Sequence, residues 1–190
     1  MNSKRIFITG IPTSGKSFLA KEIARRHDGI HVDLDQEREK MSHLHEYSEW
    51  VNFYSNKDEK KYFDSTTEQD RWDDLVKQSK NFLPYFLKKI AEYKNEEKFV
   101  IFECVNLLPE LTFDKIDFPG IVLIGNSYEE TLARLEEKSR WGSTKDLQEL
   151  EAKQFYIEQG RRYKESAEKY GYKVFKNADE ALGYLPLYNL

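Results

Sequence analysis

An eight-residue glycine pattern near the start of the chain constrains its fold more than any other feature. Gly10-Ile-Pro-Thr-Ser-Gly-Lys-Ser17 matches G-x-x-x-x-G-K-[ST], follows the apolar run Arg5–Thr9, and opens a helical pattern over Lys16–His27. In that context the glycines let backbone N–H groups turn toward phosphate oxygens, and the positive end of the helix adds to the attraction. Lys16 can reach the β- and γ-phosphates of a nucleotide, and the Ser17 hydroxyl is a ligand for Mg²⁺. The pattern therefore predicts a strand, loop and helix that bind phosphate groups.

Short apolar runs alternate with longer amphipathic stretches along the whole chain. Five runs have the length and the β-branched or aromatic content of strands: Arg5–Thr9, Ile30–Asp33, Phe99–Glu103, Ile121–Ile124 and Tyr172–Phe175. Near-continuous apolar strands separated by helices are typical of a parallel sheet covered on both faces. We expect one domain over residues 1–190, a three-layer α/β fold with about five parallel strands.

The helical patterns between the runs are of unequal length. Ser127 followed by Glu130 forms a capping-box pattern that opens a helix, and Asp179–Leu185 predicts a helix near the end of the chain. A helical period runs from Trp72 to Ala91 but contains Pro84, so we expect a kink or a break between two helices there. The second and third strands are separated by far more chain than a simple crossover needs. Residues 36–98 are therefore expected to form a helical substrate-binding insertion, at the sheet edge where pockets form in α/β proteins.

Two carboxylates follow the second strand. Asp33 and Asp35 are separated by one residue, so in an extended segment they point to the same side, toward the phosphate site. One can hold a magnesium-bound water while the other accepts a proton from an attacking hydroxyl. The alternative is a solvated turn in which Asp35 caps the next helix.

The third strand also ends in an acid. Phe99-Val-Ile-Phe-Glu103 is an apolar run whose final carboxylate can orient Mg²⁺ or its waters. Any buried strand can end in a carboxylate, so the metal role of Glu103 depends on the phosphate-binding pattern at Gly10–Ser17.

These motifs together resemble the P-loop NTPase superfamily, and within it the small-molecule kinases. Asp33-x-Asp35 resembles the shikimate kinases, and Asp35 with Arg38 resembles the polynucleotide 5′-hydroxyl kinases and their relatives. Glu103-Cys-Val-Asn-Leu-Leu-Pro109 is loosely similar to a segment of 2-phosphoglycerate-kinase-like proteins, whereas the shikimate kinases' glycine triplet after the third strand is missing. The resemblance implies that Asp35 is the general base, that Asp33 serves Mg²⁺, and that Arg38 contacts a phosphate or carboxylate of the acceptor.

The segment from Ile121 to Arg140 is similar to the fourth strand and the LID entry of adenylate-kinase-like and other small P-loop kinases. The resemblance implies that Arg134 packs on the adenine, that Arg140 stabilises the transferring phosphoryl group, and that residues 138–152 form a short LID. The alternative for Arg134 is an ordinary charged helix face. By the same analogy Asn177 lies at the adenine edge. The expected nucleotide-binding residues are Gly10, Thr13, Ser14, Gly15, Lys16, Ser17, Phe18, Arg134 and Asn177; the expected metal ligands are Ser17, Asp33 and Glu103.

The amino-acid composition limits the kinds of binding partner that the chain is expected to have. Charged residues make up 34% of the chain, and 30 Lys and Arg against 34 Asp and Glu give a net charge of −4. This balance argues against a membrane surface and against binding nucleic acid through the overall field. With one cysteine, Cys104, no internal disulfide is possible, and we expect a soluble cytoplasmic monomer or homodimer.

We therefore expect an ATP- and Mg²⁺-dependent kinase that transfers the γ-phosphoryl group to a hydroxyl or phosphate of a small-molecule metabolite. Lys16, Asp35 and Arg140 are its expected catalytic residues, and Asp33 and Arg38 its expected substrate-binding residues. Two alternatives are a polynucleotide 5′-hydroxyl kinase, although a nucleic acid partner is the less favoured one, and a non-catalytic ATP-binding module.

Overall fold

A five-stranded parallel sheet forms the centre of the computed structural model, which describes residues 4–185. Its strands run in the order β2-β3-β1-β4-β5, and every pairing is parallel. Their bounds are β1 Arg5–Gly10, β2 Ile30–Asp33, β3 Val100–Glu103, β4 Gly120–Leu123 and β5 Lys173–Phe175. Each strand is one of the predicted apolar runs, shifted by at most one residue at either end. The predicted α/β class with about five parallel strands is confirmed.

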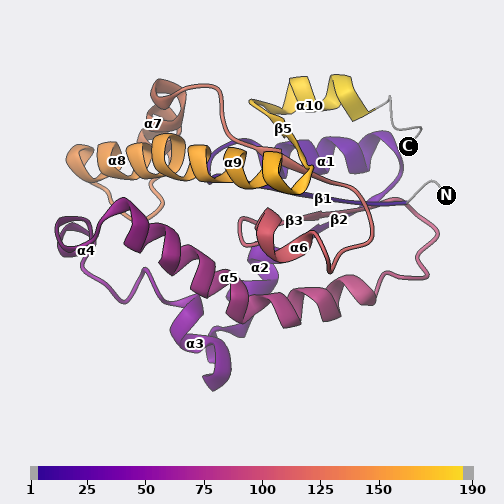
Figure 1. Ribbon diagram of the computed structural model, residues 1–190, viewed down its shortest axis with the longest axis horizontal. Coiled ribbons are helices and arrows are strands. Elements are labelled where there is room, and N and C mark those ends of the chain that lie inside the picture. Colours follow the sequence, from indigo (N-terminus) through magenta and orange to yellow (C-terminus); the bar gives the residue numbers. More distant parts are fainter. Residues whose placement is uncertain (1–3, 186–190) are drawn as a thin grey trace.

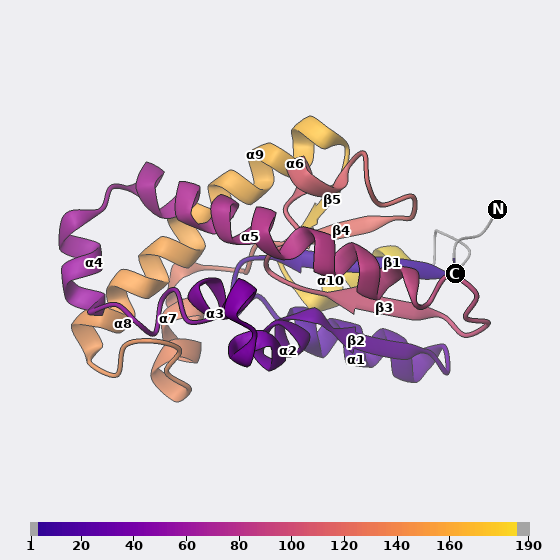
Figure 2. The ribbon, with the colours of Figure 1, turned by 90° about the horizontal axis from the view of Figure 1, so that it is seen from below.

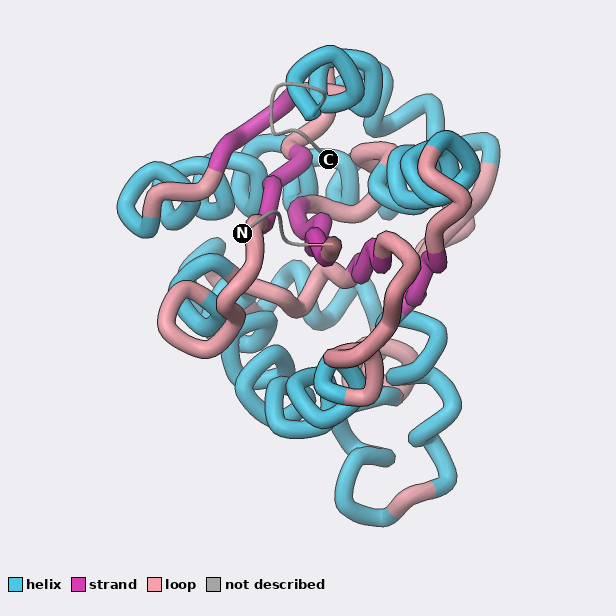
Figure 3. Tube along the Cα trace, turned by 90° about the vertical axis from the view of Figure 1, so that its right-hand side faces the viewer, coloured by secondary structure: helices cyan, strands magenta, loops and turns pink. Residues whose placement is uncertain are grey.

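Helices cover both faces of the sheet, as Figures 1 and 3 show. On one face α1 (Lys16–Arg26) packs against α10 (Ala178–Tyr184) over a core that includes Ile8, Ile101 and Leu123. The opposite face is covered by α5 (Glu68–Ala91), α6 (Pro109–Thr112) and α9 (Gly160–Tyr170). Because alternate residues of a strand point to opposite faces, side chains two apart share a layer.

Short helices gather beyond the carboxyl ends of the strands. After β2 come α2 (Leu34–Glu39), the 3-10 helix η1 (Lys40–His43), α3 (His45–Val51) and α4 (Glu59–Ser65). After β4 come α7 (Tyr128–Glu137), α8 (Lys145–Ala152) and the π-helix η2 (Lys153–Gln159), which leads into α9. Figure 2 shows α4, α7 and α8 together at the end of the molecule away from the termini. Residues 36–98 thus contain four α-helices and one 3-10 helix and no strand. Only helix α2 begins before this range, at Leu34.

Of the two outcomes expected at Pro84, a kink or a break between two helices, the break does not occur. Helix α5 starts at a capping box between Thr67 and Asp70 and continues without interruption through Pro84 to Ala91, although its axis changes direction along its course (Figure 1). Proline removes one backbone hydrogen bond, but Pro84 lies on the exposed side of the helix, where water can satisfy the freed carbonyl. On the other side Phe82 and Phe86 are fully buried, and their packing holds the two halves together. No helix among residues 4–185 is long and apolar enough to cross a membrane.

Candidate functional site

The loop between β1 and α1 has the backbone of an anion cradle. Gly10 has a φ of +127°, Thr13 a φ of +63° and Gly15 a φ of +91°, so the peptide groups turn away from a regular strand or helix. A Cβ atom at Gly10 would lie 1.9 Å from the carbonyl oxygen of Leu123, so only glycine fits beside β4. The Ser14 hydroxyl closes the loop by donating to the Ile11 carbonyl at 2.8 Å. Both ends of the loop therefore depend on the glycine pattern.

Lys16 points into this loop from the first turn of α1. Its Nζ donates to the carbonyl of Ile11 at 2.7 Å, and the side chain is buried. Burial lowers the pKa of Lys16, while the nearby carboxylates of Asp35 and Glu103 act in the opposite direction. The ammonium thus lies on the inner side of the loop, where it can exchange the Ile11 carbonyl for a phosphate oxygen.

Three hard oxygen donors meet beside Lys16, from Ser17, Asp33 and Glu103. The Ser17 hydroxyl donates to Glu103 Oε1 at 2.7 Å, and Asp33 lies in register with Glu103 across the β2–β3 pair. Glu103 is only 2% exposed, and its Oε2 atom has no hydrogen-bond partner among residues 4–185. A buried carboxylate oxygen without a donor is costly, and burial accordingly raises the pKa of Glu103. This donor set fits Mg²⁺, which prefers hydroxyl, carboxylate and water oxygens.

A cavity of about 360 Å³ lies over the loop, and most of the residues that line it are among the predicted site residues. Its cations are Lys16, Arg134 and Arg140. Four carboxylates share the same walls: Asp33, Asp35, Glu39 and Glu103. The cavity is therefore mixed in charge and not simply basic. Its carboxylates would hold a metal ion and accept a proton.

Asp35 is fixed by contacts from two elements. Its carboxylate accepts from the backbone N–H of Val105 at 3.2 Å and pairs with Arg38 at 3.1 Å. Arg38 in turn donates to the Asn106 side chain, whose amide nitrogen donates to Ser79 at 2.9 Å on α5. Asp33, and not Asp35, caps α2 by accepting from the Gln36 N–H. Asp35 is thus held in place without being used as a cap.

A second cavity, of about 450 Å³, opens beside the loop. Phe18, Arg134 and Asn177 line it together with Ser14, Gly15 and Asn126. Phe18 is 61% exposed, an unusual position for a large apolar ring. Arg134 donates to the carbonyl of Thr13 and to Glu130, while Asn177 caps α10 and donates to Asn126. Three predicted nucleotide-binding residues from separate segments, Arg134 and Asn177 among them as expected on the adenine side, thus line one cavity.

A third cavity, of about 280 Å³, lies on the other side of Asp35, toward the helical insertion. Arg38, a predicted substrate-binding residue, lines it together with residues that no sequence motif indicates. These are mainly aromatic or polar: Tyr54, Gln78, Trp141, Glu151, Gln154, Phe155 and Gln159. The last three belong to the π-helix η2, a form that often marks functional sites but has no simple sequence signal. An unusual density of glutamines and aromatic residues over 148–159 is the signal that could have indicated them.

The loop between α7 and α8 closes over this third cavity. Trp141 packs its ring against Tyr54, Tyr62 and Phe63, with ring centroids 5.6, 5.5 and 6.1 Å apart. The next residue, Gly142, has no room for a side chain, because a Cβ atom would lie 2.5 Å from the Cβ atom of Leu147, which cannot move without its backbone. Arg140 immediately precedes this anchor and has no ion-pair or hydrogen-bond partner within the part of the chain that the structure describes. An anchored loop therefore presents an unpaired cation to the phosphate cavity.

This fold and this site define a P-loop nucleotide-binding protein with the architecture of a small kinase. The model of a family described as an AAA domain matches residues 6–156, and the chain belongs to that family.

Solved structures of other proteins share this fold. The shikimate kinase from Aquifex aeolicus is 19% identical, with 97% of this chain and 95% of that chain covered and a TM-score of 0.52. A shikimate kinase from Acinetobacter baumannii, in complex with shikimate, is 14% identical, with 96% and 90% covered and a TM-score of 0.56. Among curated protein sequences, none matches this chain. The predicted P-loop kinase fold is confirmed.

Proposed function

We propose that this chain is an ATP-dependent kinase that transfers the γ-phosphoryl group to a hydroxyl or phosphate of a small-molecule metabolite. One observation carries the proposal: Asp35 and Arg140 line both the 360 Å³ phosphate cavity and the 280 Å³ inner cavity. A carboxylate that can take a proton and a cation that can meet developing negative charge thus lie where the two cavities adjoin. Phosphoryl transfer between two bound molecules requires both groups at such a junction.

The nucleotide would occupy the two cavities on the loop side. Phe18, Arg134 and Asn177 would border the adenine, and the N–H groups of Gly10–Ser17 would hold the phosphates. Lys16 would leave the Ile11 carbonyl for the β- and γ-phosphates. Ser17, Glu103 and Asp33 would hold Mg²⁺, which when bound neutralises phosphate charge.

The acceptor would occupy the inner cavity. With an acceptor hydroxyl, its oxygen forms the new bond to the γ-phosphorus, the bond to the β–γ bridging oxygen breaks, and the hydroxyl proton goes to Asp35. Val105 and Arg38 hold Asp35 in one orientation, so no reorganisation is needed at that moment. Arg140 faces the transferring group, and the anchored loop that carries it excludes water.

The inner cavity favours a small molecule over a polynucleotide. Residues 36–98, which contribute part of its lining, contain 12 Lys and Arg against 14 Asp and Glu, a slight acidic excess. A channel for single-stranded nucleic acid needs a run of cations and aromatic platforms along the backbone. Here Arg38 is already paired with Asp35, and Glu39 and Glu151 line the same walls.

An acceptor screen tests the proposal. ADP release from ATP is measured with the purified chain in the presence of metabolites that bear hydroxyl or phosphate groups, of 5′-hydroxyl oligonucleotides, and of water alone. The expected result is ADP release that depends on one small acceptor and exceeds the rate in water by at least about 100-fold. Release that is stimulated only by oligonucleotides, or by nothing, contradicts it.

A further inference from the structure

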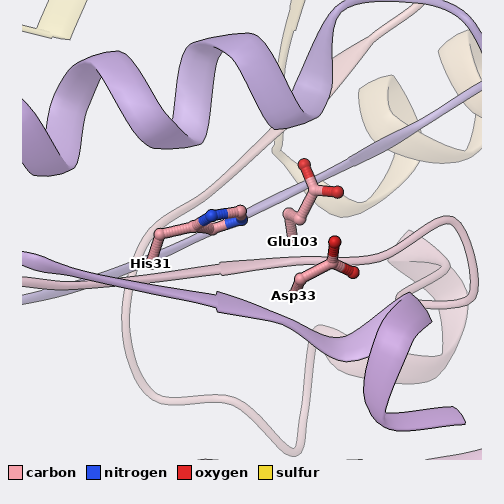
Figure 4. A group of neighbouring side chains, drawn as sticks. All are labelled: His31, Asp33 and Glu103. Carbon is pink, nitrogen blue, oxygen red and sulfur yellow. The ribbon is translucent and has the colours of Figure 1, made fainter.

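We propose that His31, Asp33 and Glu103 form a nucleotide-independent binding site for a first-row transition-metal dication, of the Mn²⁺, Co²⁺ or Zn²⁺ class, in preference to Mg²⁺. One potential ligand atom from each of the three residues lies within 4.8 Å of the others. Figure 4 shows the imidazole and the two carboxylates directed toward a shared space. The site goes beyond the proposed kinase function, because its ligand set is complete without ATP or an acceptor.

The sheet itself places these side chains together. His31 and Asp33 are two residues apart on β2, so they point to the same face. Asp33 pairs with Glu103 and His31 pairs with Ile101 in the parallel register of β2 and β3, which brings all three ligands onto the face covered by α1. Backbone pairing, rather than a mobile loop, fixes the spacing.

Two of the three groups have an unused atom in that space. Glu103 is only 2% exposed, and its Oε2 has no hydrogen-bond partner among residues 4–185. His31 Nε2 is also buried without a partner among those residues. Neither atom is paired with the other, so a bridging cation would satisfy both where the protein alone does not.

The remaining contacts leave this space to a ligand. The other oxygen of Glu103 accepts from Ser17, and Asp33 Oδ1 accepts from the Gln36 N–H. Glu103 Oε1 is therefore taken by the Ser17 hydroxyl, whereas Oε2 is left without a donor among residues 4–185. The Mg²⁺ proposed to accompany ATP needs only the side that faces Ser17, so the imidazole would be unused by that ion.

The donor chemistry selects the class of cation. One imidazole nitrogen and two carboxylates suit Zn²⁺, Co²⁺ and Mn²⁺, whereas Mg²⁺ prefers oxygen ligands in octahedral geometry and retains its waters.

The test is a metal titration of the full chain, stripped with a chelator and free of nucleotide. Co²⁺ binding is followed by its visible absorption, and Zn²⁺ and Mg²⁺ compete for the site. We expect one Co²⁺ per chain, displaced by Zn²⁺ but not by an equal concentration of Mg²⁺. His31→Gln should weaken Co²⁺ binding at least about tenfold, because an amide replaces the imidazole ligand.

The control is the double variant His43→Gln with His45→Gln, which removes the exposed histidine pair on η1 and α3. It should bind Co²⁺ within twofold of the unmodified chain. If the double variant loses the ion, or if His31→Gln binds as well as the unmodified chain, the proposal is wrong.

A second measurement needs no variant. Substoichiometric Mn²⁺ should broaden the imidazole NMR signals of His31 before those of His27, His43 and His45; equal broadening of all four contradicts the site. Neither measurement contains ATP, so failure here leaves the kinase proposal standing, and failure of phosphoryl transfer leaves this site standing.

Discussion

Asp35 has the most demanding position of any single residue in the site. It lines both the phosphate cavity and the inner cavity, and its two anchors, Val105 and Arg38, come from different elements. In the proposed reaction it would face the acceptor hydroxyl on one side and the phosphoryl group on the other. A carboxylate left free to rotate would lose the geometry that general-base catalysis needs. We infer that Arg38 serves first to orient Asp35, and only second to contact an acceptor.

Asp35→Asn tests the base. The amide keeps the size of the side chain but cannot take a proton, so kcat for the identified acceptor should fall about 10²- to 10⁴-fold. The Kd for ATP, measured by calorimetry, should stay within about threefold.

The matched control is Glu37→Gln on the same helix, whose carboxylate pairs with Lys40 and Lys89 outside the cavities. It should leave kcat within twofold. A similar loss in both variants would show that helix α2, and not the Asp35 carboxylate, is what matters.

At the scale of single residues, the sequence predicts well only those site residues that belong to one short, contiguous motif. Gly10–Ser17, Asp33 and Asp35 belong to local patterns, and the structure places each of them on the phosphate cavity or within the backbone of its loop. His31 carries no signal in the sequence, because its significance depends on the pairing of β2 with a strand about 70 residues away. Neither spacing nor composition reports the register of a parallel sheet.

At the scale of elements, the packing of β1 against β4 leaves no space at the start of the phosphate loop. The Cβ clash of 1.9 Å at Gly10 involves backbone, which cannot move aside without separating the two strands. Gly10→Ala should lower the free energy of unfolding by at least about 2 kcal/mol, from overpacking and from its φ of +127°. Urea denaturation followed by circular dichroism measures this.

Gly183→Ala is the control for that substitution. Gly183 lies in α10, where an alanine Cβ would have no atom within 4 Å among the described residues, and alanine is the better helix former. It should be neutral or stabilise the chain by up to about 1 kcal/mol. Equal destabilisation by both alanines would contradict the packing argument.

The loop that carries Trp141 is held by two buried acids, Glu59 and Glu151. Burial raises the pKa of Glu151 to about 7, with Glu59 adding to the rise, while the backbone N–H groups of Trp141 and Gly142 and the cation of Arg140 lower it. In the unfolded chain the value is near 4.5, so between about pH 4.5 and 7 the folded chain binds the extra proton. The contribution of Glu151 to stability is thus fully present below pH 4.5 and is lost as the pH rises toward 7.

Glu151→Gln should remove this dependence. Its free energy of unfolding relative to the unmodified chain should rise between pH 4.5 and 8, by up to about 3 kcal/mol. Denaturant unfolding at a series of pH values measures the difference. Glu149→Gln, an exposed neighbour on α8, should show no such rise. A flat difference for Glu151→Gln contradicts the buried-acid account of this loop.

Elements are predictable where one physical signal dominates. Apolar runs locate all five strands, and Ser127 caps α7 as expected by accepting from the Glu130 N–H. Pro84 does not break the helix, because the local helix-breaking tendency of proline is weaker than the burial of Phe82 and Phe86. The glutamines and aromatic residues over 148–159 could indicate a lined cavity, but they are equally compatible with an ordinary α-helix, so the π form of η2 has no sequence signal.

At the scale of the whole molecule, the order β2-β3-β1-β4-β5 brings the ends of β1, β2 and β3 side by side. Their terminal residues supply the phosphate loop, the Asp33–Asp35 pair and Glu103, so one edge of the sheet concentrates the chemistry. The helices beyond that edge divide the space into a nucleotide side and an inner cavity. That strand order and that division could not be predicted from the sequence, which indicates only that strands and helices alternate.

The helical substrate-binding insertion at 36–98 and the LID at 138–152 stay predictions, both in their bounds and in their functions. The structure describes helices within both ranges and a loop, residues 138–144, in which Trp141 is anchored. For the inner cavity to open when substrates bind, the contacts of Trp141 with Tyr54 and Tyr62 would have to break.

The most direct test of the central claim follows the phosphorus atom itself. ATP labelled in the γ-phosphate is incubated with Mg²⁺, the acceptor identified by the screen, and either the unmodified chain or Lys16→Ala, and the products are separated. Label should appear on the small acceptor with the unmodified chain, and the rate should fall at least about 100-fold with Lys16→Ala, because the cation that meets the transferring charge is gone. Label that never leaves ATP, or transfer undiminished in Lys16→Ala, would contradict the account.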